Sequence, residues 1–242
     1  MDDEQMVRVE RSNGWASVVL NRPHRKNAIT GPLMDQLADV ITSLSADTTV
    51  AAIVLRGEAG AFCSGVDLTE LQAAPPHPWV PHFGDSVRRA HIALFRCACP
   101  VVVALERYGI NAGTSLALSG DLVIAGETSF LQIGEIRQGA HIPMNAAWMR
   151  IKSNEHVLAR MALLGDRVAG PELLRLGLVH EVVADDEVRS RAEAVAAQLA
   201  GFPDQSSRNV KRDIRQHLDL DPETWFSSTS NAALLSADQV RS

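Results

Sequence analysis

The sequence predicts an α/β (α+β) protein in which strand–strand–helix units follow one another and a helical region ends the chain. Short apolar runs rich in Val, Ile, Leu and Ala alternate with segments of helical period, and glycine-containing turns separate them. From Asn145 onward, helical patterns prevail. We therefore expect a core over residues 1–184 and a helical region over residues 185–242. A chain of 242 residues is long enough to bury a large core.

The first part of the chain predicts a hairpin, a helix and a third strand. Val7–Val9 and Ala16–Leu20 flank Asn13-Gly14, which is a strong signal for a tight turn between antiparallel strands. Pro32–Leu44 has apolar residues at helical spacing, and Ala51–Arg56 is a short apolar run typical of a buried strand.

The middle of the chain begins with a long loop, because Gln72–Gly84 contains four prolines. Further strands are predicted at Val101–Leu105, Leu122–Ala125, Ser129–Gln132 and Leu178–Val183, and helices at Ser86–Cys97, Leu116–Ser119, Asp185–Gly201, Asp204–Leu218 and Asp221–Ala237. Asp185 is expected to cap its helix, and Pro222 fits the first position of the last one.

Composition narrows the class of protein. A net charge of −6 argues against a nucleic-acid surface, and no apolar run is long enough to cross a bilayer. Cys63, Cys97 and Cys99 form no Cys-x-x-Cys pair, and the eight histidines are scattered. We therefore expect neither a disulfide framework nor a metal site, and a soluble protein in the reducing cytoplasm.

The stretch Ala61–Asp67, reading Ala-Phe-Cys-Ser-Gly-Val-Asp, follows a predicted strand and precedes a short helix near Leu68. The first turn of a helix leaves backbone N–H groups without internal acceptors. Gly65 allows a ligand to approach the backbone closely, so two such amides could form an oxyanion hole. Taken alone, the stretch is equally consistent with a simple connector.

Four ordered blocks carry a resemblance to a known family. They are Leu20–Pro23 followed by Asn27-Ala28, the turn Ala61–Asp67, the segment Pro100–Asp121, and Glu135–Gly139. Together they resemble the crotonase superfamily, the enoyl-CoA hydratase/isomerase family, over residues 6–215.

The resemblance implies a crotonase-like spiral of ββα repeats and an enzyme of fatty acid metabolism. The substrate would be a coenzyme A thioester, with no prosthetic group and no metal. The C-terminal helices, residues 185–242, would mediate assembly into a homotrimer or a dimer of trimers.

The resemblance also assigns site residues. The backbone amides of Val66 and Ala112 would hold the thioester oxygen, and Glu135 would carry the proton. Ser115 occupies the place of a second glutamate that hydratases of the family use. The family's Gly-Gly-Gly is Asn111-Ala112-Gly113 here, and alanine cannot reach some glycine conformations.

Coenzyme A would bind along the basic turn after the second strand and along the Ala61–Asp67 stretch. The residues expected to contact it are Arg25, Lys26, Ala28, Ala61, Ser64 and Gly65. The long loop, with Trp79 and Phe83, is expected to cover the acyl chain. Glu106 and His141 are further candidates near the site.

A single retained glutamate favours one-base isomerisation of an enoyl-CoA over efficient hydration, because hydration needs a second group to orient the water. Alternatives within the superfamily are an acyl-CoA decarboxylase or a thioesterase. From another class, a non-catalytic acyl-CoA binding protein would keep the pocket without the acid–base residues.

Overall fold

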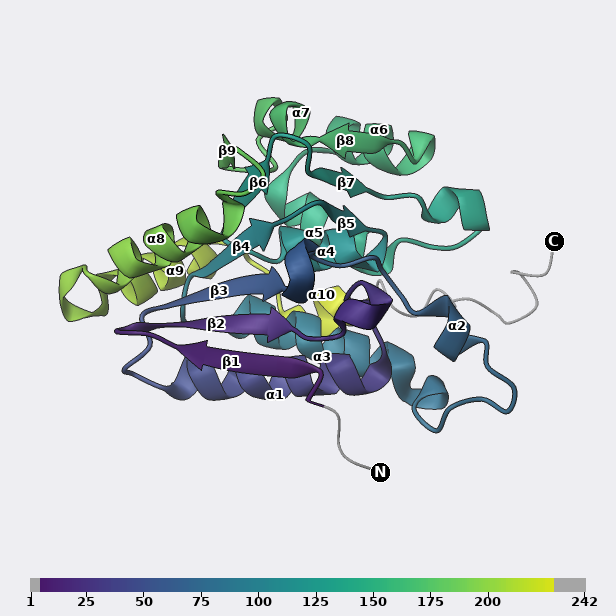
Figure 1. The fold of residues 1–242 in the computed structure, drawn as a ribbon, viewed down its shortest axis with the longest axis horizontal. Coiled ribbons are helices and arrows are strands. Elements are labelled where there is room, and N and C mark those ends of the chain that lie inside the picture. Colours follow the sequence, from purple (N-terminus) through teal and green to yellow (C-terminus); the bar gives the residue numbers. More distant parts are fainter. Residues whose placement is uncertain (1–4, 229–242) are drawn as a thin grey trace.

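A computed structural model describes residues 5–228, and a six-stranded sheet forms its centre (Figure 1). In spatial order the strands are β1 (Val7–Arg11), β2 (Trp15–Leu20), β3 (Ala52–Gly57), β4 (Val101–Leu105), β6 (Leu122–Gly126) and β9 (Glu181–Val183). Only the β1–β2 pair of this sheet is antiparallel. β3 and β4 are buried along their whole length, as expected for parallel strands covered on both faces.

A second, smaller sheet contains β5 (Tyr108–Ile110), β7 (Phe130–Gln132) and β8 (Arg167–Ala169). Two successive segments of the chain place one strand in the central sheet and the next in the smaller sheet, and then add a helix, whereas β1 and β2 both lie in the central sheet before α1. β4 and β5 lead into α4 (Ala112–Leu118), and β6 and β7 lead into α5 (Pro143–Lys152). This arrangement confirms the predicted spiral of ββα repeats.

Helices cover both faces of the central sheet (Figure 1). α1 (Gly31–Ala46) packs with α3 (Phe83–Arg96) on one face, and α8 (Val188–Ala200) packs on the other. Ala192 and Ala196 let α8 lie close to β3 and β4. The remaining helices are α2 (Leu68–Leu71), α6 (Glu155–Leu164), α7 (Gly170–Arg175), α9 (Ser206–Gln216) and α10 (Pro222–Ser228), and single 3₁₀ turns lie at Pro23–Arg25, Glu58–Gly60, Val80–His82, Glu135–Gln138 and Pro203–Gln205.

Several predicted boundaries need correction. β5 and β8 were not predicted, because three-residue strands show no alternation that a sequence pattern could reveal. The last strand covers only Glu181–Val183, and α3 begins inside the predicted loop, at Phe83. α10 starts at Pro222 as predicted, and positions 229–237 of that predicted helix lie outside the described residues.

The prediction that Asp185 caps α8 is wrong. α8 begins after Glu187, which makes no side-chain capping bond. The Asp185 carboxylate instead accepts hydrogen bonds from the backbone N–H and hydroxyl of Thr128. Asp185 therefore joins two loops rather than starting a helix.

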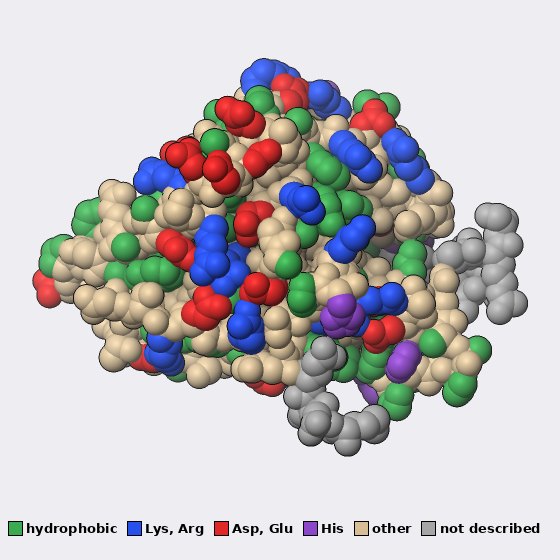
Figure 2. Space-filling model, in the orientation of Figure 1, with side chains coloured by type: hydrophobic (Ala, Val, Ile, Leu, Met, Phe, Trp, Pro, Cys, Tyr) green, Lys and Arg blue, Asp and Glu red, His purple; other side chains and the backbone are tan. Residues whose placement is uncertain are grey.

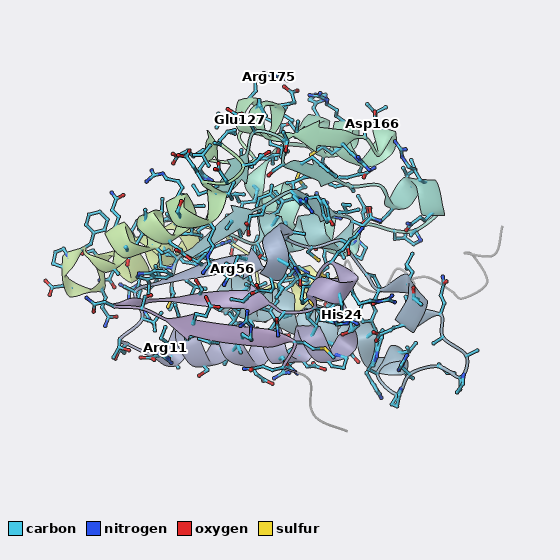
Figure 3. All side chains as sticks on the ribbon, in the orientation of Figure 1. Arg11, His24, Arg56, Glu127, Asp166 and Arg175 are labelled. Atoms are coloured by element: carbon cyan, nitrogen blue, oxygen red, sulfur yellow. The ribbon has the colours of Figure 1, made fainter. Side chains whose placement is uncertain are left out.

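Charged side chains of both signs are interspersed on the face that carries β1 to β3 (Figure 2). On β3, the guanidinium of Arg56, labelled in Figure 3, donates to both carboxylate oxygens of Glu10, at 2.9 and 2.8 Å. This view shows no continuous basic surface. No helix within residues 5–228 has both the length and the apolar character required to cross a membrane.

Phe226 anchors α10 to the body of the protein. Its side chain is fully buried and stacks on His91 at 6.1 Å between ring centroids. Trp148 and Phe95 complete the aromatic cluster at 5.3 and 6.0 Å. The last described helix is therefore part of the hydrophobic core.

Replacing Phe226 by Ala should lower the free energy of unfolding by about 3–5 kcal/mol, the range for removing a buried Phe side chain. Urea unfolding followed by circular dichroism measures the change. Leu163→Ala is the matched control, because Leu163 is 68% exposed and lies on α6. Equal losses in the two variants would show that α10 is not held by this cluster.

Candidate active site

A cavity of about 180 Å³ opens where the turns after β3 and β5 meet α3 and the 135–145 segment. Its lining combines an apolar wall with a few polar groups, as small-molecule sites do. The lining residues are Ser64, Val66, Leu68, Phe83, Val87, Ile110, Asn111, Ala112, Ser115, Glu135, Gln138, Ala140, His141, Ile142, Pro143, Met144 and Asn145.

Two glycines allow the turns after β3 and β5 to pack backbone against backbone. Gly65 has φ +94°, and a Cβ there would lie 2.8 Å from the carbonyl oxygen of Ile110. A Cβ on Gly113 would lie 2.6 Å from the carbonyl oxygen of Cys63. Ile110 N–H donates to that same Cys63 oxygen at 3.1 Å. A larger residue at either glycine would force the turns apart.

This contact brings Val66 and Ala112 to the same cavity. Among the described residues, the backbone N–H of neither residue donates a hydrogen bond. Ala112 is the first residue of α4, where a helix has no internal acceptor for its N–H. Two unpaired amides at one cavity can stabilise negative charge on an oxygen.

In the turn after β5, Asn111 and not Ala112 adopts the positive-φ backbone conformation that glycine favours. Asn111 has φ 53° and ψ −119°, whereas Ala112 is already helical. Asn111 N–H donates to Gln132 O at 2.7 Å, and its side-chain Oδ1 accepts from Gly134 N–H at 2.9 Å. These bonds hold a backbone conformation that is costly for a non-glycine residue. The alanine at position 112 therefore faces no steric conflict.

Glu135 presents a buried carboxyl group to the cavity. The residue is 8% exposed, and its Oε1 accepts a hydrogen bond from Asn145 Nδ2 at 2.9 Å. Its Oε2 is buried with no partner among the described residues. Burial raises the pKa of Glu135 to about 7. The group can therefore accept and return a proton near neutral pH.

Ser115 lines the cavity but is tied to its own helix. Its hydroxyl donates to Ala112 O at 2.7 Å, and its Oγ lies 3.4 Å from His91 Nε2. Trp148 Nε1–H donates to His91 Nδ1 at 2.9 Å, so a neutral His91 ring carries its proton on Nε2. Burial lowers the pKa of His91 to about 3. His91 therefore donates toward Ser115 and cannot activate it as a nucleophile.

Sequence reasoning did not single out His91. The only signal was the helical spacing of Val87, His91 and Leu94, which places His91 on the inward face of α3. Its partners Ser115 and Trp148 lie far away in the sequence, and no spacing rule connects them.

Asp67 pairs with the basic turn after β2. It caps α2 through Glu70 N–H at 3.2 Å, as expected of an Asp before a helix. It also accepts from Arg25 at 3.0 and 3.1 Å and from the buried Arg22 at 3.2 Å. His24, labelled in Figure 3, marks this turn. The charge of Arg25 is therefore already paired within the protein.

The other residues expected to contact coenzyme A lie in the same two segments. Ser64 lines the cavity, and its N–H donates to Lys26 O at 3.2 Å. The carbonyl oxygens of Ala28 and Ala61 accept hydrogen bonds from Arg22 and Asn27. Gly65 O accepts from Ile29 N–H at 2.8 Å. The role of these residues in binding coenzyme A remains a prediction.

The remaining candidates divide between the cavity and its surroundings. Phe83 and His141 line the cavity, whereas Trp79 packs against Phe83 with ring centroids 5.4 Å apart. Glu106 is not a lining residue, and burial raises the pKa of its carboxyl group. Within residues 5–228, no three His, Cys, Asp or Glu side chains are grouped so that they could hold a metal ion.

A family model described as enoyl-CoA hydratase/isomerase matches residues 10–237. The chain belongs to this family. It is 29% identical to 1,2-epoxyphenylacetyl-CoA isomerase of Escherichia coli K12 over 196 residues, which are 78% of this chain and 74% of that protein. It is 26% identical to 2,3-dehydroadipyl-CoA hydratase of the same organism, over 86% and 81% of the two chains.

Solved structures share the fold. An enoyl-CoA hydratase/isomerase from Xanthobacter autotrophicus Py2 superimposes with a TM-score of 0.82 at 25% identity, covering 97% of this chain and 87% of that chain. The protein is thus a crotonase-fold enzyme of the enoyl-CoA hydratase/isomerase family, whose members act on acyl-CoA thioesters. Its relatives include both an isomerase and a hydratase, so their names do not separate the two reactions.

The raised pKa of Glu135 predicts a pH-dependent stability cost. Between the ordinary carboxyl pKa of 4.5 and about 7, the folded protein keeps a proton that the unfolded chain releases. Stability therefore falls as pH rises through this window. Glu135→Gln removes the cost, so its stability relative to the parent should rise by about 3 kcal/mol from pH 4.5 to pH 8.

Urea unfolding at a series of pH values measures this difference. Glu127→Gln, at an exposed position, controls for the loss of one carboxylate. A difference between Glu135→Gln and the parent that stays constant with pH would mean that the Glu135 carboxyl is not perturbed.

Proposed function

We propose that the enzyme moves the double bond of a 3-enoyl-CoA to the 2-position, with Glu135 as its only acid–base group. One observation carries the proposal: Glu135 is the one carboxylate among the described residues that line the cavity. It lies in the same cavity as the two unpaired backbone amides of Val66 and Ala112.

In the proposed reaction, the amides of Val66 and Ala112 bind the thioester oxygen. Glu135 removes a proton from Cα, and the electron pair moves onto that oxygen to form a dienolate. The same carboxyl group then returns the proton to Cγ, which leaves the double bond between Cα and Cβ. Each backbone donor in such a hole contributes about 3 kcal/mol to transition-state stabilisation.

Hydration fits the cavity less well. Addition of water requires a second group that holds and deprotonates the water while the first protonates carbon. Ser115 stands at that position, and its hydroxyl hydrogen is donated to Ala112 O. A neutral serine cannot serve as a carboxylate base near neutral pH.

The alternatives differ in what they ask of these residues. A thioesterase acting through an acyl-serine needs a base for Ser115, and the His91 ring presents a donor there. A decarboxylase would need the amides of Val66 and Ala112 but no base. A non-catalytic binder would gain nothing from a buried carboxyl group such as that of Glu135, whose Oε2 has no partner among the described residues. The isomerase uses both backbone amides and the Glu135 carboxyl group.

Binding of coenzyme A and assembly complete the proposal. We assign the coenzyme A contacts to Lys26, Ser64 and Gly65 with support from Arg25, Ala28 and Ala61.

We assign residues 185–242 to oligomer contacts in a homotrimer or dimer of trimers. Exposed apolar side chains on α9 and just before it support that assignment, namely Phe202, Val210 and Ile214. The free cysteines Cys63, Cys97 and Cys99 support a cytoplasmic location.

Glu135→Gln should lower kcat/KM for a 3-enoyl-CoA by about 10²–10⁴-fold, because the amide cannot accept the proton. The parent enzyme should gain activity as pH rises through about 7, since the deprotonated form of Glu135 is the base. Chromatography of the acyl-CoA products measures both effects, and Glu127→Gln should behave as the parent.

The same assay discriminates the alternatives. Unchanged turnover in Glu135→Gln, or hydration of crotonyl-CoA faster than isomerisation, would overturn the one-base isomerase. Release of free coenzyme A would identify a thioesterase, and turnover of a malonyl-type thioester alone a decarboxylase. Binding of acyl-CoA with no turnover of any enoyl, β-keto or malonyl-type thioester would identify a binding protein.

A further inference from the structure

Asn145 connects the Glu135 carboxyl group to the turn that carries the Ala112 amide. It is the third residue of α5, is 1% exposed and lines the cavity. Its side-chain Nδ2 donates to Glu135 Oε1 at 2.9 Å and to Asn111 O at 3.0 Å. One amide group therefore bridges the acid–base carboxyl and the residue immediately before the Ala112 amide.

The orientation of the Asn145 amide is fixed by these two acceptors. Both hydrogens of Nδ2 are used, one by the Glu135 carboxylate and one by the Asn111 carbonyl. Rotating the amide by 180° would place its oxygen against two oxygens, and both bonds would be lost. The remaining atom, Oδ1, is buried without a partner among the described residues.

We propose that Asn145 is a positioning residue that fixes the Glu135 carboxylate relative to the backbone turn at Asn111 and Ala112. The inference rests on the roles proposed for Glu135 and Ala112. Neither the family match nor the relatives' names assign a function to Asn145.

The first consequence concerns the charge of Glu135. A hydrogen bond from a neutral donor favours the ionised carboxylate, so Asn145 opposes the effect of burial on the pKa. The neighbouring charges do not take part in this balance: Arg137 pairs with Asp166 at 2.7 Å at the surface. His141 is the other titratable side chain in the cavity lining, and it is exposed. On α4 and α5, the charged side chains Arg150 and Lys152 lie in the last turn of α5, away from Asn145.

The second consequence concerns the backbone turn. Asn111 O accepts from Asn145 Nδ2 and from Thr114 N–H at 2.9 Å. The peptide that follows Asn111 includes the Ala112 N–H, so fixing this carbonyl also fixes the direction of that donor. Loss of Asn145 should therefore lower kcat even where Glu135 is fully ionised, with a smaller effect on KM.

The test compares Asn145→Ala, Asn145→Ser and the nearly isosteric Asn145→Asp across pH. Asn145→Ala should move the rise of kcat/KM with pH upward by about one to two units, the effect of losing one hydrogen bond to a charged group. Asn145→Asp should move it further, because a second carboxylate repels the charge of Glu135. Asn145→Ser should lie between the parent and Asn145→Ala, since its hydroxyl can restore one donor. Asn13→Ala, at an exposed asparagine between β1 and β2, should leave the profile unchanged.

A second readout does not depend on activity. In protein labelled with ¹³C at the glutamate carboxyl carbons, the resonance missing from Glu135→Gln reports the titration of Glu135 directly. An upward shift in Asn145→Ala supports the inference even if no 3-enoyl-CoA is turned over, in which case the proposed reaction alone has failed. An unchanged titration in a folded Asn145→Ala or Asn145→Asp variant overturns the inference, whatever the reaction proves to be.

Discussion

The close contact between the backbones of the two turns after β3 and β5 is the constraint on which the site depends. Gly65 and Gly113 leave room for carbonyl oxygens of the opposite turn, and the Ile110–Cys63 hydrogen bond links the two segments. The spiral makes this contact possible because consecutive repeats place equivalent turns side by side. As a result, two backbone amides from segments more than forty residues apart reach one cavity. Side chains can then vary around the amides without removing them.

Around this rigid backbone, the enzyme keeps a carboxyl group in a setting that disfavours its charge. Burial of Glu135 costs stability near neutral pH, and Asn145 recovers part of the cost through one hydrogen bond. The neutral His91 ring and the Ser115 hydroxyl form a separate polar network that is satisfied within the protein. The described lining of the cavity therefore contains one carboxyl group beside an apolar wall and a few other polar groups, which suits proton transfer between two carbons of a bound acyl chain.

Much of the fold could be predicted from the sequence, because β2, β3 and β4 are continuous apolar runs and α1 has apolar residues at helical spacing. The three-residue strands β5 and β8 could not, since pairing with distant strands and not local pattern defines them. The turn at Ala61–Asp67 and the segment after Glu135 were recognisable as motifs. The positive φ of Asn111, the pairing of Arg25 with Asp67, and the bridge made by Asn145 were not, because each depends on contacts across the chain.

The central claim is that the amides of Val66 and Ala112 polarise a single thioester carbonyl. Difference infrared spectroscopy of a saturated acyl-CoA, carrying ¹³C at the thioester carbonyl, tests this directly because the ligand has no double bond to move. The account predicts that the carbonyl stretch of the bound ligand lies at lower wavenumber than that of the free ligand in water, because two fixed hydrogen bonds draw electron density onto the oxygen. A carbonyl band of the bound ligand at or above its wavenumber in water would contradict the account.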